Sequence, residues 1–253
     1  MGKKILVYTA LFGNYDKLLE PEVMDDECDY VCVTDNNDIL SEKWDVIYVK
    51  PHCDSVEMNR QYKMLPHRFF ADYDISLYID ANVKLKGRPS NLIKKYMASA
   101  SLAFPRHFKR NCIYDEAMIC LRHKKITKEQ FDKITEELLK GNRFPSQIGL
   151  AENNILIRNH HDESLIKVME DWWLSFKIYA PRDQLTLMYL LWKNKSSFVF
   201  MEESSRNKNS YFSYHLHKQN ITKSGFKNMI LLMASRRHVN ILNNFIARIM
   251  DKL

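Results

Sequence analysis

Glycine and proline are scarce in this sequence, which has 6 glycines and 7 prolines among 253 residues. Long flexible linkers and low-complexity segments are rich in these residues, so their scarcity excludes both kinds of region. Internal repeats with the period of a solenoid protein are also missing. Because 45% of the residues are apolar, the chain has enough hydrophobic material for one large domain or a domain with an appendage.

Cysteines are few and show no pairing pattern. The five lie at positions 28, 32, 53, 112 and 120, and no Cys-x-x-Cys pair occurs. Cys28 and Cys32 have no second pair at the spacing of a zinc site. The number is odd and fits no disulfide framework, so we expect reduced thiols and a cytoplasmic protein.

Long hydrophobic runs are missing too. The longest late run, Met229 to Ala234, is far too short to span a bilayer. The first apolar stretch continues into Asn14 and Asp16, where a signal peptide would have small residues for cleavage. We therefore expect a soluble protein, and contact with the surface of a membrane stays open.

Lysine and arginine outnumber acidic residues by 38 to 31, which gives a net charge of +7 and a pI near 9.0. Such a surplus suits nucleic acid, sugar nucleotides or an anionic membrane face, and the alternative is that it only keeps the protein soluble. The cations are scattered, with no block of five, and no motif for RNA or DNA occurs. Nucleic acid is therefore not an expected partner.

Short apolar segments alternate with segments of helical period in the first half of the chain. Strands are predicted at 5–9, 30–34, 46–49, 75–79, 101–104, 153–158 and 198–201, and helices at 55–70, 89–98, 114–122, 127–139, 163–176, 182–192 and 226–253. Pro66 is expected to kink or end the first helix, and Thr127 with Gln130 forms a predicted capping box. This alternation predicts an α/β fold with a largely parallel sheet.

The strand at 75–79 ends in Asp80, Ala81 and Asn82. Ligands of parallel α/β sheets bind at the carboxyl ends of the strands, which is where these side chains would lie. A carboxylate and an amide two residues apart can hold one Mg²⁺ or Mn²⁺ ion together with substrate phosphates. The alternative is that both residues only form a turn, as Asp and Asn often do.

Four blocks of the sequence together carry a family resemblance. They are YTALFGNYD (8–16), RQYKMLPHRFFADYDISLYIDANVKL (60–85), CIYDEA (112–117) and RDQLTLMYLLWK (182–193). In this order they resemble the glycosyltransferase-like family named after the plant TOD1 and MUCI70 proteins and earlier catalogued as DUF616. The resemblance covers roughly residues 5–195 and implies a GT-A fold, an α/β sandwich that binds nucleotide sugars.

The resemblance also implies roles for the donor-binding residues. The Asp-x-Asp motif of GT-A enzymes corresponds to Asp80-Ala81-Asn82, and the loop after the first strand would bind the nucleotide. In that loop Phe12 or Tyr15 would stack on the base, and backbone groups near Gly13 would meet the base or ribose. The further residues expected at the nucleotide and its diphosphate are Thr9, Ala10, Asp35, Arg60 and Lys63. Arg60 and Lys63 lie three apart on a predicted helix, and the alternative is a solvated helix face.

Catalytic and metal-binding roles follow from the same resemblance. Asp183, in the first turn of a predicted helix, is expected to contact the acceptor hydroxyl or serve as its base. Glu116 is expected on the acceptor side, where the alternative is a carboxylate that stabilises a helix start. His215 or His217 would join Asp80 and Asn82 around Mn²⁺ or Mg²⁺, and their alternation allows only one to face the site if the segment is extended.

We therefore predict a GT-A domain over residues 1–222 and a helical extension over 223–253. The predicted activity is transfer of a sugar from a nucleotide-diphosphate sugar to a carbohydrate or a lipid-linked glycan in the synthesis of surface polysaccharide. UDP is the expected nucleotide of the donor. The basic, amphipathic extension would dock on the protein's own core or lie at the inner face of a membrane. The alternative function is an inactive GT-A-like module that binds a glycan or a nucleotide.

Overall fold

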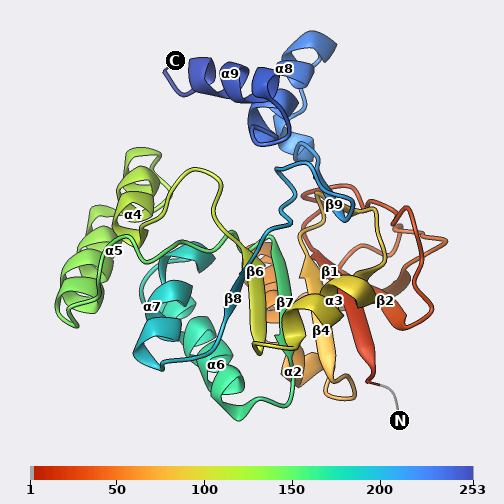
Figure 1. The fold of residues 1–253 in the computed structure, drawn as a ribbon, viewed down its shortest axis with the longest axis horizontal. Helices are drawn as coiled ribbons and strands as arrows, with labels where there is room; N and C mark the ends of the chain where they lie inside the picture. The colour runs from red at the N-terminus through yellow and green to blue at the C-terminus, as the bar shows by residue number, and fades with distance from the viewer. Residues whose placement is uncertain (1–2, 253) are drawn as a thin grey trace.

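The computed structural model describes residues 3–252. Its centre is a seven-stranded sheet of order β3-β2-β1-β4-β7-β6-β8 (Figure 1). The strands are β1 Ile5–Leu11, β2 Cys28–Thr34, β3 Asp45–Tyr48, β4 Ile75–Ile79, β6 Leu102–Pro105, β7 Ile155–Asn159 and β8 Val199–Met201. Within this sheet β7 runs antiparallel to β4 and β6, and the other neighbours are parallel. The predicted α/β fold with a largely parallel sheet is confirmed.

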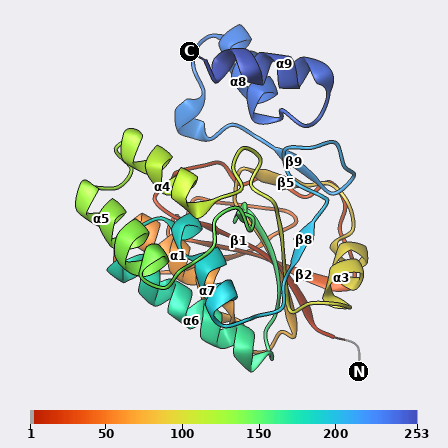
Figure 2. The same cartoon turned by 60° about the vertical axis from the view of Figure 1, so that its left-hand side comes forward.

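Apolar cores lie on both faces of the sheet. Side chains of a strand alternate between faces, so Tyr8 of β1 packs into one core and Val7 into the other. Helices α1 (Ser55–Met64), α6 (Glu163–Ile178) and α7 (Leu187–Lys193) contribute to the first core, and α3 (Pro89–Met97) to the second. Figure 2 shows these two helical layers on opposite sides of the strands.

Shorter elements surround this sandwich, and several differ from the predicted ones. Pro66 separates α1 from α2 as expected, and the capping box of Thr127 and Gln130 is present. The helix predicted at 127–139 is α-helical and then π-helical, and the one predicted at 182–192 begins as a 3-10 turn. The bounds of these shorter elements are α2 Pro66–Phe69, α4 Ile113–Arg122, α5 Lys128–Asp132, the π-helix η1 Lys133–Lys140 and the 3-10 helix η2 Asp183–Leu185. Of these, α4 agrees with the helix predicted at 114–122.

Strands β5 (Val83–Leu85) and β9 (Phe212–Tyr214) form a second, antiparallel sheet that the sequence did not predict. Each has three residues, which is too short to show an alternating pattern. Their pairing brings residues just after β4 beside residues far along the chain. This small sheet therefore places Asn82 next to the segment that contains His215 and His217.

The C-terminal segment forms two helices rather than the single predicted one. The short 3-10 helix η3 (Lys218–Asn220) leads to α8 (Gly225–Ser235), and α9 (Ile241–Met250) follows after a turn. The chain breaks there because the Asn240 side chain accepts a hydrogen bond from the Asn243 backbone and so starts a new helix. Figures 1 and 2 show this helix pair at one end of the molecule, beyond the carboxyl ends of β1 and β4. The boundary at residue 222 stays a prediction.

Candidate active site

A cavity of about 450 Å³ opens at the carboxyl ends of β1 and β4. Its walls come from the end of β1 and the loop after it, from α1, from the loop after β4, from Arg182 just before η2 and from the segment around η3. Tyr15, Arg60, Asp80, Arg182 and His217 are among the residues that line it. Residues from four of the predicted functional segments therefore meet at the edge of the sheet where a ligand was expected.

Asp80 is fixed at the rim of this cavity by its strand and by two hydrogen bonds. The Tyr78 hydroxyl donates to Asp80 Oδ1 at 2.7 Å, and Lys63 Nζ donates to the same oxygen at 3.3 Å. Burial raises the pKa of Tyr78 well above its ordinary value, and the Asp80 charge raises it further. Tyr78 therefore stays a donor at neutral pH. No hydrogen bond within residues 3–252 uses Asp80 Oδ2, so this oxygen is available to a ligand.

Lys63 lies between two carboxylates beneath the cavity. Its Nζ is 2.8 Å from Asp183 Oδ2 and 3.3 Å from Asp80 Oδ1, and its side chain is only 2% exposed. Arg60 approaches Asp183 Oδ1 at 3.7 Å. Burial by itself would raise the pKa of Asp183, but the charges of Arg60 and Lys63 hold it below its ordinary value. A carboxylate with a lowered pKa is a weak base, so this geometry favours a positioning role for Asp183.

Asn82 and His217 face each other beside Asp80. The amide Nδ2 of Asn82 donates to the His215 carbonyl at 2.9 Å and lies 3.3 Å from His217 Nε2. His217 Nδ1 is 2.7 Å from Asp16 Oδ2. A carboxylate at Nδ1 favours the tautomer with its proton there, which leaves the Nε2 lone pair for Asn82 or for a metal ion.

The donor groups fit a hard cation only in part. Asp80 and His217 line one cavity, and the Asp16–His217 pair is the outer support that metal-bound histidines often have. Among the described residues, however, no group of three His, Cys, Asp or Glu is placed to hold a metal. Magnesium is commonly held by one or two carboxylates together with substrate phosphates. The residues present therefore suit an ion whose coordination is completed by a bound diphosphate.

The loop after β1 presents one exposed ring to the cavity. Tyr15 is 48% exposed, and its ring lies edge-on to His217 at 5.2 Å. Phe12 lines the cavity too, but it is 3% exposed and stacks on Tyr62. The Gly13 backbone N–H donates to both oxygens of Asp35, at 3.0 and 3.1 Å. Asp35 thus holds the loop in place, and Tyr15 is the exposed ring of this loop at the cavity.

Several predicted site residues lie outside the cavity lining. Thr9 is buried within β1, and the His215 side chain is half-buried beside Ser213. Glu116 is buried on α4, where Arg110 Nε donates to its carboxylate. Arg110 lies just ahead of α4 and pairs with Glu116 in its first turn, so the contact has the geometry of a structural ion pair. Ala10 and Ala81, in contrast, do line the cavity.

Sequence reasoning assigned no role to several residues that the structure brings to the site. Asp16, Asn59, Arg182 and Gln219 line the cavity. Asn59 Nδ2 donates to the Ala10 carbonyl at 2.6 Å and thereby ties α1 to β1. The YTALFGNYD and RDQ blocks contained a signal for Asp16 and Arg182, because both residues stand inside these blocks.

A buried polar cluster continues from Asp80 into the start of β7. The Asp80 backbone N–H donates to the Asn154 carbonyl at 2.9 Å. Asn153 is 1% exposed, yet neither atom of its amide has a hydrogen-bond partner among residues 3–252, and Glu152 Oε2 has none there either. Burial raises the pKa of Glu152, although Arg206 opposes the shift. Because buried polar groups are nearly always hydrogen-bonded, this cluster points to a polar ligand or ordered water close to Asp80.

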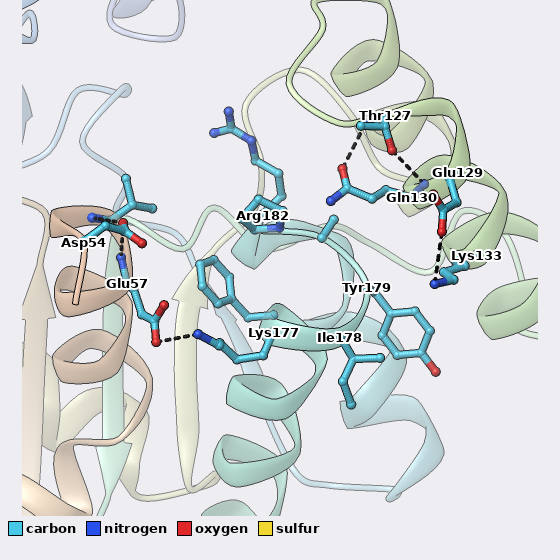
Figure 3. Close-up of a pocket in the computed structure, with 14 residues that line it drawn as sticks. Asp54, Glu57, Thr127, Glu129, Gln130, Lys133, Lys177, Ile178, Tyr179 and Arg182 are labelled. Carbon is cyan, nitrogen blue, oxygen red and sulfur yellow. Dashed lines mark hydrogen bonds and ion pairs between the residues drawn. The ribbon is translucent and has the colours of Figure 1, made fainter. Parts of the chain in front are cut away.

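A second, larger cavity of about 750 Å³ adjoins the first and shares Val56 and Arg182 with it. It is a groove between the start of α1, α5 and the end of α6 (Figure 3). Two of its carboxylates are taken up by neighbours, since Glu57 pairs with Lys177 and Glu129 with Lys133. Arg182, at the junction of the two cavities, forms no ion pair within the described chain.

Residues 1–217 match the model of the TOD1/MUCI70, glycosyltransferase-like domain. No curated protein matches the chain in sequence. Among the described residues, no helix has both the length and the apolar character needed to cross a membrane.

Solved structures of glycosyltransferases are similar in fold. The apo structure of the bifunctional glycosyltransferase WbbM is 11% identical with a TM-score of 0.52, over 94% of this chain and 45% of that one. GlyE of Streptococcus pneumoniae TIGR4 is 14% identical with a TM-score of 0.46, over 79% and 46%. Mouse xyloside xylosyltransferase 1 is 11% identical with a TM-score of 0.45, over 81% and 86%. The chain thus spans less than half of the length of WbbM and GlyE, and its fold is GT-A-like, as predicted.

Proposed function

The chain belongs to the TOD1/MUCI70 glycosyltransferase-like domain family, and we propose that it transfers a sugar from a nucleotide-diphosphate sugar to a glycan. UDP is the proposed nucleotide, and surface polysaccharide synthesis in the cytoplasm is the proposed setting. The observation that carries the proposal is the meeting of Asp80, His217, Arg60 and Tyr15 around one cavity at the carboxyl edge of the sheet. A ring that can stack on a base, a cation that can pair with phosphate and two side chains that could hold a metal ion together suit a nucleotide diphosphate.

Each part of the donor has a matching group in the proposal. The exposed Tyr15 ring stacks on the base, and Arg60 offers its guanidinium to the diphosphate. Asp80 and His217, with Asn82 beside them, would hold Mg²⁺ or Mn²⁺, which neutralises charge on the leaving diphosphate. Lys63, paired with Asp80 and Asp183, fixes the Asp80 carboxylate rather than meeting the donor. Asn153, whose buried amide has no hydrogen-bond partner among the described residues, is proposed to bond to a sugar hydroxyl directly or through ordered water.

The acceptor glycan is proposed to lie in the second cavity. This groove shares Arg182 and Val56 with the donor cavity, so the two cavities are neighbours. An acceptor bound in the groove would therefore lie beside the donor sugar. Its lining mixes paired charges with Thr127, Gln130 and Tyr179, which suit the hydroxyls and the apolar faces of sugars. Arg182 would bind an anionic group at the junction.

The decisive experiment is a thermal-shift screen of nucleotide sugars with and without Mn²⁺, followed by an assay of donor hydrolysis. A ligand that binds only the folded state stabilises it by about 2.7 kcal/mol at a hundred times its Kd. We expect a UDP-sugar to raise Tm, more so with Mn²⁺, and Asp80→Ala to lose the shift and the hydrolysis. Asp72→Ala, an exposed carboxylate in the turn before β4, is the matched control. If no nucleotide sugar raises Tm, the proposal fails.

The second candidate function is a binding module without turnover. Asn82 in place of a second carboxylate and the missing third metal-binding residue among those described favour it. The same screen separates the two, because such a module would bind a nucleotide or a glycan but hydrolyse no donor. A lipid-linked acceptor and contact with the inner face of a membrane also belong to the proposal, supported by the basic C-terminal helices.

A further inference from the structure

The C-terminal segment carries almost the whole net charge of the protein. Residues 218–253 contain seven lysines and arginines and one acidic residue, Asp251, while the entire chain has a net charge of +7. The rest of the chain is therefore nearly neutral. Lys223, Lys227 and Arg248 are exposed and form no ion pair with another residue of the described part. A positive field is thus concentrated on one end of the molecule.

The same end exposes large apolar side chains. None of the 11 residues of α8 is buried, and Phe226 and Met229 are 72% and 49% exposed. On α9, Ile241, Phe245 and Ile249 are 90%, 61% and 46% exposed. Their spacing of four residues puts these three side chains on one face of the helix. We call Phe226, Met229, Ile241, Phe245 and Ile249 the apolar surface.

Polar contacts fix the helix pair to the body while the apolar surface stays outside. Arg236 Nε donates to the Tyr214 carbonyl at 2.7 Å, and Arg206 Nη1 donates to the Ser235 carbonyl at 3.1 Å. Lys109 pairs with Asp251 at the end of α9. On α9, Asn243 and Ala247 are the buried residues, and they lie on the face opposite to Ile241, Phe245 and Ile249. The exposed apolar face is therefore held in a defined position rather than left on a loose tail.

We propose that α8 and α9 form a docking surface for a bilayer that contains anionic phospholipids. The apolar surface would enter the boundary between headgroups and acyl chains, and Lys223, Lys227 and Arg248 would meet the lipid phosphates. Charge argues against a second copy of the chain as the occupant. Two such surfaces would bring like charges together, whereas an anionic bilayer complements them.

The docking surface begins next to the proposed active site. Gln219 lines the donor cavity, and Ile221, two residues later, is 57% exposed at the start of the docking surface. Docking would hold the mouth of the cavity close to the bilayer, within reach of a glycan attached to a lipid. This purpose rests on the proposed function, but lipid binding itself does not depend on donor binding.

The test is flotation of the full chain with vesicles. We expect the protein to float with vesicles of phosphatidylcholine and phosphatidylglycerol, to stay behind with phosphatidylcholine alone, and to be released by high salt. I241S/F245S should lose most of the binding by removing the apolar anchor, and K223E/K227E by removing the charge. The matched controls are Leu40→Ser, an apolar residue 89% exposed elsewhere, and K124E/K125E. Both controls should float like the wild type.

Three results would overturn the proposal. The wild type could fail to float with anionic vesicles, or the two helix variants could float as well as the controls. The third is concentration-dependent self-association of the wild type that I241S/F245S abolishes, because a second copy would then cover the surface. Hydrolysis of the donor in solution, measured on the same variants, should be unchanged. Its loss in all proteins would count against the proposed function and leave lipid binding standing.

Discussion

At the scale of single residues, the site is organised by charges that compensate each other. Arg60 and Lys63 surround Asp183, and Lys63 also reaches Asp80. A buried cation between two carboxylates is costly to disturb, because removal of one partner leaves a charge without compensation. The contact of Lys63 with Asp80 Oδ1 also holds the Asp80 side chain at the cavity, where a cation could bind it.

Asp183→Asn tests this pairing. The change keeps the shape of the side chain but removes the charge between Arg60 and Lys63, so we expect a loss of about 3 kcal/mol in the free energy of unfolding. Because its pKa is lowered in the folded state, Asp183 stabilises the fold at any pH above the ordinary pKa of an Asp, which is about 3.9. This contribution disappears as the pH falls through the pKa that Asp183 has in the folded state. The variant should therefore approach the wild type below that pH.

Urea unfolding at neutral and acid pH measures the effect, and the exposed Asp38→Asn is its control. Equal stability of Asp183→Asn and wild type at pH 7 would show that the pair contributes nothing.

His107 gives a second prediction at this scale. Its Nδ1 accepts hydrogen bonds from the backbone N–H groups of Lys109 and Arg110, at 3.2 and 3.0 Å, so the ring is held neutral. Glu116 lies 3.9 Å from Nε2, but that contact is an ion pair only if the ring is protonated. Burial and then the charges of Arg110, Arg206 and other nearby cations lower the pKa of His107 from 6.5 to about 3.

A lowered histidine pKa stabilises the fold above the unfolded value of 6.5, and the stability is lost as the pH falls towards 3. Each pKa unit corresponds to about 1.4 kcal/mol. His107→Asn keeps an acceptor for the two N–H groups and does not titrate. We expect it to flatten the decrease in unfolding free energy between pH 6.5 and pH 3, as followed by urea unfolding at a series of pH values. A decrease as steep as that of the wild type would exclude His107 as its source.

At the scale of elements, the turn between β1 and the following loop shapes the cavity that we propose for the donor. Gly13 has a φ of +67°, and a Cβ added to it would lie 2.6 Å from the Cβ and Oγ of Ser55 at the start of α1. Both the backbone conformation and the close approach therefore require glycine. The contact sets the distance between the loop that presents Tyr15 and the helix that presents Arg60.

Gly13→Ala should cost about 1–2 kcal/mol in the free energy of unfolding, from the left-handed backbone and the displaced helix. It should also weaken donor binding, because the cavity walls move apart. Thermal shift with and without the nucleotide sugar measures both effects. Gly225→Ala is the matched control, since an added Cβ there meets nothing within 4 Å. Donor binding equal to that of the wild type would mean that this contact does not shape the cavity.

At the scale of the whole molecule, the helix pair α8–α9 adds little to the core. Helix α8 buries no residue, and α9 buries Asn243 and Ala247. Every residue of the two apolar cores lies in the chain ahead of this helix pair. Ala247 is buried but belongs to neither core. The predicted boundary at residue 222 thus has a measurable consequence.

A chain that ends at residue 222 should unfold cooperatively in urea, with an m-value only slightly below that of the full chain, because m follows the surface exposed on unfolding. It should keep the thermal shift with a nucleotide sugar, since His217 and Gln219 remain. Truncation at residue 210, which also removes β9 and His217, is the contrasting variant and should lose the shift. Non-cooperative unfolding of the longer fragment would show that 223–253 belong to the same folding unit.

The order of strands and helices along the chain was largely readable from the sequence, because apolar alternation and caps are local signals. Pro66, the capping box at Thr127 and the strand before Asp80 all lie where those signals placed them. The blocks that resemble a family also identified Tyr15, Arg60 and Asp80, which line the cavity. The sequence did not predict the break between α8 and α9, because apolar residues keep a helical spacing across it. The turn lies between Ser235 and Ile241, and Asn240 caps the helix that follows.

Tertiary structure alone decided which of these residues meet and in what state. It buries Lys63 between two carboxylates and pairs Glu116 with Arg110. It also places His217 within hydrogen-bond distance of Asp16, 201 residues away in the sequence. It also selected His217 over His215, because β9 pairs with β5 and fixes which side of the segment faces the cavity. The physical reason is range: periodicity and capping act within a few residues, whereas ion pairs and burial depend on how distant elements pack.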